Sequence, residues 1–428
     1  MNPNFPKPLT PIAYPSTPEE LEQLRLFHNR HLRPQMVGIH ALVGLSPHNS
    51  ASRSVMVSQH LPQHLVISGV EKPYIISGPE YRLADYTFAT KMPENGRVVS
   101  VINRYSQTVG VGGVKGTPER TVIYMKETGE LDVFHIREWS GYHQYFGFRN
   151  KIKPMTNRLR GDETSIPKDY VFADTPAVTE DGCYCWGANF EAAFFDRRAT
   201  AEDGAIVSEE ALQRMKFFVY EERDVSVGSQ EIPLNIQGTN EEYKVFADIG
   251  ENIRTDGLVM ATRPYSDRLS VATMTPEDLR EPYSVFDTRR YSREAIIDKE
   301  LLQMIREGKA KASPGRIVDI QVIRNNDQNQ SLPKTMTAQL DRYADALVVY
   351  YSQILAVVRK YEIEDRRKGG VGAVPMTPKL SNLLERAMVI SAQGGNRFSG
   401  SINLQNNRNT LDEYNIKFII EHEITPNK

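Results

Sequence analysis

The sequence predicts a mixed α+β protein that is rich in β-structure. Apolar and polar residues alternate between turn residues from Val98 to about Ile136, which is typical of a small unit of β-strands. A further strand is predicted from Arg316 to Arg324. After Pro333, apolar residues recur at alternating steps of four and three, which is typical of a helix that packs against another helix. The chain therefore combines sheet-forming with helix-forming segments.

Composition limits the class of protein. The chain has 428 residues, enough for two or three domains, and its 40% hydrophobic and 25% charged residues are typical of a globular protein. A net charge of −2 argues against a free-standing nucleic-acid binder held by bulk charge. The two cysteines, Cys183 and Cys185, are too few for a disulfide framework or a zinc quartet, so we expect ordinary core or surface positions. We expect neither a signal peptide nor a membrane span, since no apolar run approaches about 20 residues.

The first 16 residues carry repeated prolines, too many for a helix or an interior strand. An extended tail that lies on a partner and plain disorder are both open interpretations. Thr17 to Glu20 then predicts the start of a helix, with a capping pair three residues apart and proline at the first helical position.

A pair of acids stands between two predicted elements in the middle of the chain. A buried strand is predicted from Phe190 to Phe195, and a polar turn with Glu202 and Asp203 follows it. Ser208 then caps a helix that has two glutamates in its first turn. Acids fixed between a strand and a capped helix can place charge near a metal or a phosphate. Their spacing alone would favour an ordinary solvated turn.

Three helices are predicted in the second half of the chain. One runs from Ser292 to Gly308, and its apolar face is either core or a docking surface. A longer helix follows Pro333, and another begins at Thr377-Pro378; with a glycine-rich loop between them they form a predicted antiparallel hairpin. The seam of the longer helix consists of Met336, Leu340, Tyr343, Leu347, Tyr350, Ile354, Val357 and Tyr361.

The order of residues around the acid pair resembles the β subunit of multisubunit RNA polymerases. In that family a strand leads into a Phe-Glu-Asp turn, a Val-Ser-Glu helix and an Arg-Asp…Gly-x-x-Glu-Ile region. The corresponding residues here are Ala201-Glu202-Asp203, Val207-Ser208-Glu209, Arg223-Asp224 and Gly228 to Ile232. Two departures are that Ala201 replaces the family's aromatic residue and that residues 197–200 replace its Asn-Gly-Tyr-Asn run.

A second block resembles the same family beside its nucleotide site. His48 to Met56, followed by Gln63, matches a segment with a His-Asn start, an arginine, a methionine three residues later and a downstream glutamine. Arg53 matches the arginine that the family directs at the incoming triphosphate. An arginine suits that role because its planar fork binds phosphate oxygens in pairs and stays charged. A lone arginine in a polar loop would be a surface residue, but the flanking pattern favours a site role.

Weaker matches continue in the same order along the chain. They are Gly161 to Pro176, Ile249 to Pro264 and Ser313 to Val322. The chain ends on an apolar strand that in the family leads into a motif with two RNA-binding lysines, and this motif is absent here. The resemblance therefore implies a middle segment of a split β subunit, most like the divided subunits of giant tailed bacteriophages.

The resemblance also implies an architecture. We expect a partial double-psi β-barrel region with an inserted flap domain and a helical hairpin. The expected segments are a proline-rich tail (1–16), a segment beside the nucleotide site (17–95), a β-rich unit (96–175), the barrel strand with the Glu-Asp turn and following helix (176–240), a flap-like domain (241–330), the helical hairpin (331–395) and a strand returning to the barrel (396–428).

The implied activity is template-directed RNA synthesis within an assembly. Glu202 and Asp203 are the candidate catalytic residues, with Asp203 in the outer shell of a second Mg²⁺, and no metal is held directly by this chain. Arg53, Met56 and Gln63 are the candidate substrate-binding residues for nucleoside triphosphates. The Mg²⁺ cofactor would be held mainly by a β′-type partner.

The expected partners are the remaining β and β′ polypeptides, template DNA, the RNA transcript and a promoter-specificity factor at the flap, with no membrane. The expected location is the cytoplasm of an infected bacterium or the virion. An alternative interpretation is a non-catalytic phage structural or DNA-packaging protein that retains a degenerate polymerase-like fold.

Overall fold

The structure is a computed structural model in which two compact units can be described separately. One unit comprises residues up to 89 together with 174–217, and the other comprises 90–173 together with 218–427. Sheets and helices occur together, which confirms the mixed, sheet-rich α+β class. The described residues are 17–19, 22–23, 42, 49–76, 79–105, 114, 116–143, 146–161, 164–193, 204–228, 230–264, 274–276, 278–280, 293–297, 315–325, 332–393 and 412–426.

A four-stranded sheet confirms the β-rich unit predicted between Val98 and Ile136. Its order is β4-β3-β2-β8, and all its pairs are antiparallel. The strands are β2 (Gly96–Asn103), β3 (Glu119–Lys126), β4 (Leu131–Arg137) and β8 (Ser165–Ile166). Val122, Ile123 and Tyr124 are all fully buried although successive side chains point to opposite faces. Both faces of β3 are therefore covered.

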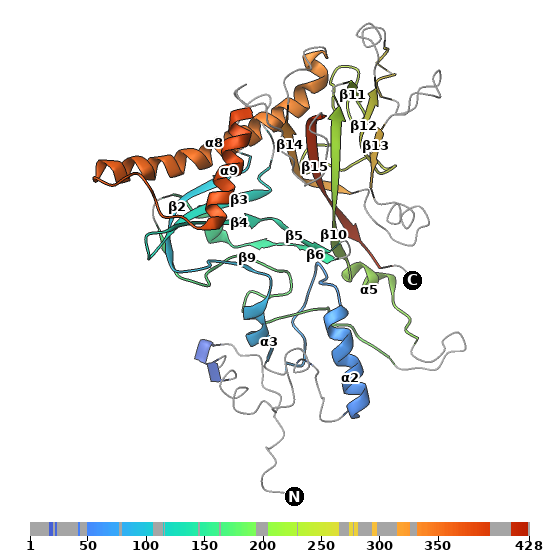
Figure 1. Ribbon diagram of the computed structural model, residues 1–428. Coiled ribbons are helices and arrows are strands. Elements are labelled where there is room, and N and C mark those ends of the chain that lie inside the picture. Colours follow the sequence, from blue (N-terminus) through green and yellow to red (C-terminus); the bar gives the residue numbers. More distant parts are fainter. Residues whose placement is uncertain are drawn as a thin grey trace, which may run out of the picture. The chain divides into compact units, whose positions relative to one another are not determined.

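Two helices cover one face of this sheet (Figure 1). They are α8 (Lys334–Arg367) and α9 (Pro378–Gln393), as predicted, and Figure 1 shows α9 crossing α8. At 34 residues α8 is about 50 Å long. Ile123 and Leu131 of the sheet pack in one cluster with Ile354 of α8 and Leu384 of α9. The predicted seam is buried from Met336 to Ile354 and partly buried at Val357 and Tyr361.

The opposite face packs against shorter elements. These are β1 (Thr90–Lys91), β7 (Lys151–Ile152), α4 (Pro154–Arg158) and β9 (Val171–Asp174). The three strands form a separate sheet with the order β1-β9-β7. Phe172 of β9 packs with Val122 and Tyr124, and its carbonyl accepts a hydrogen bond of 2.7 Å from Thr156 Oγ1.

A five-stranded sheet brings the last strand of the chain into the interior. Its order is β14-β15-β10-β6-β5. The strands are β5 (Trp139–His143), β6 (Phe146–Arg149), β10 (Phe217–Gly228), β14 (Arg316–Arg324) and β15 (Asp412–Ile424). β14 has the predicted bounds, and it pairs with β15 so that Ile320 lies opposite Phe418. Phe418 packs against Phe246, with ring centroids 5.1 Å apart.

A fourth sheet corrects the helix predicted from Ser292 to Gly308. Its strands are β11 (Glu231–Pro233), β12 (Leu258–Pro264) and β13 (Arg293–Ile296), in that order. β13 pairs antiparallel with β12, and these ladder hydrogen bonds replace the intrahelical ones that the apolar spacing had suggested. Residues 298–308 of the predicted helix lie outside the described residues.

The other unit is built from short helices and irregular chain. It contains α2 (Ala51–His60), η3 (Leu61–Gln63), α3 (Pro79–Leu83), η4 (Ala84–Tyr86) and α5 (Glu209–Arg214). Cys183 and Cys185 are fully buried in a cluster with Tyr81, which confirms them as ordinary core residues. The helix predicted from Thr17 is helical at 18–19 and 22–23. Residues 1–16 lie outside the described part.

The strand predicted from Phe190 to Phe195 is wrong for the residues that are described. Residues 190–193 form no regular structure, and Phe190 is 37% exposed. The preceding Asn189 donates its backbone N–H to Glu71 Oε2 at 2.9 Å instead of to a neighbouring strand. The ring of Phe190 lies 4.7 Å from the guanidinium carbon of Arg214, so its apolar surface is covered by a cation.

Among the described residues, none of the helices combines the length and the apolar character needed to cross a membrane.

We predict that Ile354→Ala lowers the free energy of unfolding of the larger unit by about 2–5 kcal/mol. Ile354 of α8 is fully buried against the four-stranded sheet and α9, so truncation leaves a cavity that rigid neighbours cannot fill. Urea denaturation measures the change. Arg359→Ala, on the exposed side of α8, is the control and should change stability by no more than about 0.5 kcal/mol. Equal stabilities of the two variants would contradict this packing.

Candidate functional site

The predicted catalytic acids, Glu202 and Asp203, lie outside the described residues. The helix that follows them is described. Ser208 caps α5 as predicted, and its Oγ accepts a hydrogen bond of 3.2 Å from the backbone N–H of Ala211. Two glutamates occupy the first turn of α5, where they interact favourably with the helix dipole.

The predicted substrate-binding residues lie on and after helix α2. Ser50 caps the helix by accepting a hydrogen bond of 3.4 Å from the backbone N–H of Arg53. Arg53 is exposed, and its Nη1 lies 3.7 Å from Met56 Sδ, so the structure brings these two residues together. Gln63 is also exposed and ends the short η3 turn beyond the helix. The segment is thus a solvated helix.

A buried ion cluster that the sequence did not reveal joins two sheets. Arg104, at the end of β2, is 6% exposed, and its Nη2 lies 2.5 Å from Glu119 Oε2 on β3. Its Nη1 pairs with Asp319 Oδ2 on β14. His135 Nδ1 lies 3.1 Å from Glu119 Oε1, and Arg137 Nε lies 2.7 Å from Glu119 Oε2. Burial alone would raise the pKa of Glu119, but Arg104, the hydrogen bond with His135 and Arg137 lower it well below the ordinary value of 4.5.

The ion cluster lines a small polar cavity of about 260 Å³. Trp139 and Tyr220 stack at its wall with ring centroids 5.5 Å apart. Charged residues of both signs face this cavity and pair with one another, as Lys417 does with Glu222. Paired charges of this kind favour a structural role over a ligand site.

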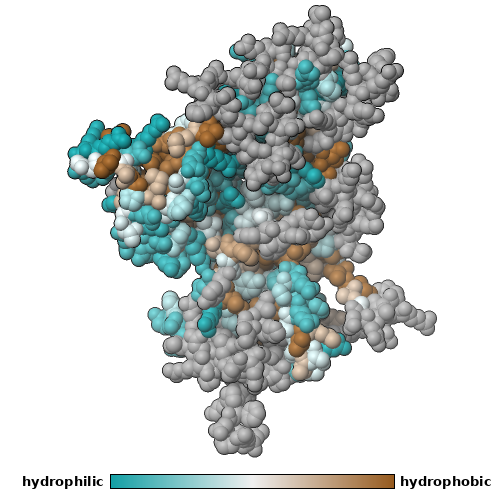
Figure 2. Space-filling model, viewed as in Figure 1, coloured by the Kyte–Doolittle hydropathy of each residue, from teal (hydrophilic) through white to brown (hydrophobic). Residues whose placement is uncertain are grey.

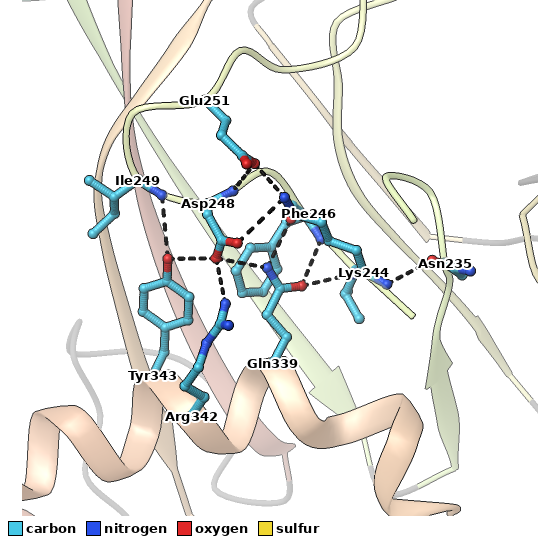
Figure 3. Close-up of polar contacts among 10 residues, drawn as sticks. Asn235, Lys244, Phe246, Asp248, Ile249, Glu251, Gln339, Arg342 and Tyr343 are labelled. Atoms are coloured by element: carbon cyan, nitrogen blue, oxygen red, sulfur yellow. Dashed lines mark hydrogen bonds and ion pairs between the residues drawn. The ribbon is translucent and has the colours of Figure 1, made fainter. Parts of the chain in front are cut away.

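A second polar network fixes the loop before Ile249 to helix α8 (Figure 3). Asp248 Oδ1 accepts hydrogen bonds from Gln339 Nε2 at 3.1 Å, Arg342 Nη2 at 2.6 Å and Tyr343 Oη at 2.9 Å. Burial would raise the pKa of Asp248, but Arg342 and these hydrogen bonds lower it. Gln339 Oε1 also accepts from the backbone N–H groups of residues 245 and 246. In the sequence, the only sign of this network is Gln339, a glutamine beside the apolar seam of the helix.

A larger cavity of about 1030 Å³ opens next to this network. It lies among the first half of α8, residues 235–248 and residues 274–279, all in one unit. Arg342 and Asp248 contribute to its wall. A cavity of this size holds a drug-sized molecule or part of a bound peptide.

No metal site is evident in the part of the chain that the structure describes. Within it, no three His, Cys, Asp or Glu side chains are grouped so that they could hold a metal ion.

Comparison with known proteins identifies distant relatives. The chain is similar to β subunits of bacterial RNA polymerase. The "DNA-directed RNA polymerase subunit beta" of Chlamydia pneumoniae is 24% identical over 371 residues, which cover 83% of this chain and 27% of that protein. The corresponding subunit of Chlamydia felis is 25% identical over 341 residues, covering 76% and 25%. That of Rubrobacter xylanophilus is 23% identical over 251 residues, covering 56% and 20%.

The chain thus spans about a quarter of the length of the curated relatives it matches. No protein-family model matches it. The similarity supports a relationship with polymerase β subunits and agrees with the resemblance carried by the sequence motifs.

We predict that Glu119→Gln flattens the acid dependence of stability. The folded-state pKa of Glu119 is lowered, so its contribution is complete above the unfolded value of 4.5 and is lost as the pH falls below it. The wild-type free energy of unfolding should therefore fall more steeply below pH 4.5 than that of the variant. At neutral pH the variant should be less stable by roughly 1.5–3 kcal/mol. Urea denaturation at a series of pH values from about 3 to about 7 measures both effects, because this range includes the ordinary carboxyl pKa.

The control for this experiment is Glu127→Gln, an exposed glutamate at the end of the β3 hairpin. Its stability curve should follow that of the wild-type protein. Parallel curves for wild type and Glu119→Gln would show that the buried cluster does not hold Glu119 ionised.

Proposed function

We propose that this chain is a β-type segment of a multisubunit DNA-directed RNA polymerase that contributes nucleotide-binding and active-site-supporting residues. The observation that carries the proposal is similarity to a polymerase β subunit along 83% of the chain. The colinear motifs around Arg53, Ser208 and Glu231 support the same function, since they recur in the family's order.

The proposed architecture includes part of a double-psi β-barrel with a flap-like insertion. The long strands β10 and β15 support it, because they come from distant parts of the chain and are neighbours in one sheet. The flap-like domain would include β12, which lies within the Ile249–Pro264 match, and β13, which follows it. The strand β15 would be completed by another polypeptide.

In this proposal Arg53 binds the triphosphate of the incoming nucleotide. Its exposed guanidinium on α2 is available for paired hydrogen bonds with phosphate oxygens and would neutralise charge as pyrophosphate leaves. Met56, beside Arg53, and Gln63 would contact the nucleotide and the RNA end. Glu202 and Asp203 would support the site electrostatically.

Polymerisation of nucleotides uses two Mg²⁺ ions that stabilise the attacking and leaving oxygens. In this proposal the ions are held mainly by a β′-type partner, as the resemblance to the polymerase family implies. Asp203 would lie in the outer shell of the second ion. The proposed assembly further contains the remaining β and β′ pieces, template DNA, RNA and a promoter-specificity factor, and its divided subunits would be those of a giant phage.

A non-catalytic phage structural or packaging protein is the alternative. The departures at Ala201 and at residues 197–200 favour it, since they alter the run that leads into the acid pair. Such a protein would share the fold but would not co-purify with polymerase subunits.

We predict that Arg53→Ala in the assembled enzyme lowers kcat/KM for nucleotides by about 10- to 100-fold, mainly through KM. This range corresponds to the loss of charge-assisted hydrogen bonds worth roughly 1.5–3 kcal/mol. Steady-state transcription at varied nucleotide concentration measures it. Arg359→Ala on the exposed side of α8 is the matched control and should leave the kinetics unchanged. Wild-type affinity and turnover in Arg53→Ala would remove the proposed role of Arg53.

We also predict that native mass spectrometry of the complex that co-purifies with this chain finds polypeptides with the family's lysine motif and a β′-type aspartate cluster. The purified chain alone should make no RNA with any divalent metal, because in this proposal those groups belong to partner polypeptides. Co-purification with capsid or tail proteins only would favour the alternative. RNA synthesis by the isolated chain would contradict the proposal that the polymerase is divided among chains.

A further inference from the structure

The cavity of about 1030 Å³ beside α8 is lined by polar and apolar side chains together. Its apolar lining comes from separate segments of the larger unit, namely Val114, Met274, Leu279, Ala346 and Val349. Val349 is 53% exposed, so this apolar surface continues outward along the helix. Burying such a surface against an apolar side chain contributes favourable free energy of about 25 cal/mol per Å².

The cations in the cavity wall are already neutralised. Arg104 is held by Asp319 and Glu119. Lys244 Nζ lies 2.5 Å from Glu251 Oε2 and 3.4 Å from Asp248 Oδ2, and Arg342 is bound to Asp248. None of these cations is left to attract an anion into the cavity.

The acids at the exposed side of the cavity are not neutralised in the same way. Glu241 and Glu242 are exposed, and within the described chain neither forms an ion pair. Asp345 is 64% exposed and reaches Arg324 only at 3.4 Å. The cavity therefore carries an excess of negative charge at its mouth, which attracts cations and repels the phosphates of RNA or DNA.

We propose that this cavity docks a segment of a partner protein that presents an apolar side chain flanked by lysine or arginine. The apolar lining would take the side chain, and Glu241 and Glu242 would pair with the flanking cations. The hydrogen bonds that Asp248 accepts from α8 keep the wall formed without the ligand, which reduces the entropy lost on binding. The inference rests on the cavity alone and stands apart from the proposed polymerase activity.

Further half-exposed apolar residues lie on α9, which packs against α8. Met388 and Val389 of α9 are 50% and 39% exposed, and Figure 2 shows apolar residues among hydrophilic ones over the α8–α9 region. A protein segment can use such a surface beyond the cavity, whereas a small cation would use only the acids. This favours a protein partner over a free small molecule.

The first test uses a fluorescent amphipathic peptide with leucine on one face and lysine on the other, titrated with the full chain and followed by anisotropy. An otherwise identical peptide with glutamate for each lysine should not bind. The double variant Glu241→Gln/Glu242→Gln should weaken binding of the basic peptide by about 3- to 10-fold, the range for a pair of exposed charges. The control Glu127→Gln/Glu385→Gln removes two exposed acids outside the cavity and should bind like wild type. Equal losses in both double variants, or binding of the acidic peptide, would overturn the proposal.

The second test identifies the natural occupant. The substitution Val349→p-benzoylphenylalanine places a photo-cross-linking side chain at the cavity of the full chain in its native complex. The complex is irradiated and digested, and mass spectrometry identifies the cross-linked peptide. We expect a cross-link to a segment of another polypeptide in which lysine or arginine flanks an apolar residue. A cross-link to this chain itself, to nucleic acid or to an acidic segment, or no cross-link, would overturn it. Circular dichroism checks that the substitution at this half-exposed position leaves the fold intact.

Discussion

The larger unit depends on one buried guanidinium. Arg104 follows β2, and its partners Glu119 and Asp319 lie on β3 and β14, so this one side chain links the four-stranded sheet to the five-stranded sheet. Desolvating a lone arginine would cost several kcal/mol, and two carboxylates are needed to compensate it. Other arrangements of the two sheets would leave this buried charge unpaired and are therefore disfavoured. Apolar contacts alone would tolerate such arrangements more readily.

Helix α8 extends that constraint across the whole unit. Its first half packs Leu340 and Tyr343 into the core of the five-stranded sheet, and its middle packs Ile354 onto the four-stranded sheet. Between these two contacts, Gln339 and Arg342 hold the loop at Asp248. Since a single long helix is stiff over this length, the two sheets, the loop and the cavity beside them are held as one framework.

The sequence predicted those elements whose signal is local. Period-two alternation located the strands around Val122 and in β14, and the steps of four and three located α8. Serine capping located the start of α5. The helix predicted from Ser292 was wrong at its start, because pairing with β12 is a long-range contact that spacing along the chain does not encode. The strand predicted at Phe190 was wrong because the backbone N–H of the preceding Asn189 donates to the side chain of Glu71, distant in sequence, and not to a strand partner.

The same distinction explains what could be predicted of the candidate site. Arg53 and Met56 are three residues apart on one helix, so the motif placed them together, whereas Glu119 and Asp319 meet only through the sheets. Arg53 and Met56 are exposed on their helix, whereas Glu119 and Asp319 are buried and paired with Arg104. Under the proposed function, the two exposed side chains would stay open to a nucleotide and to partner chains. The two buried carboxylates are already paired within the chain, so they serve to hold the two sheets together.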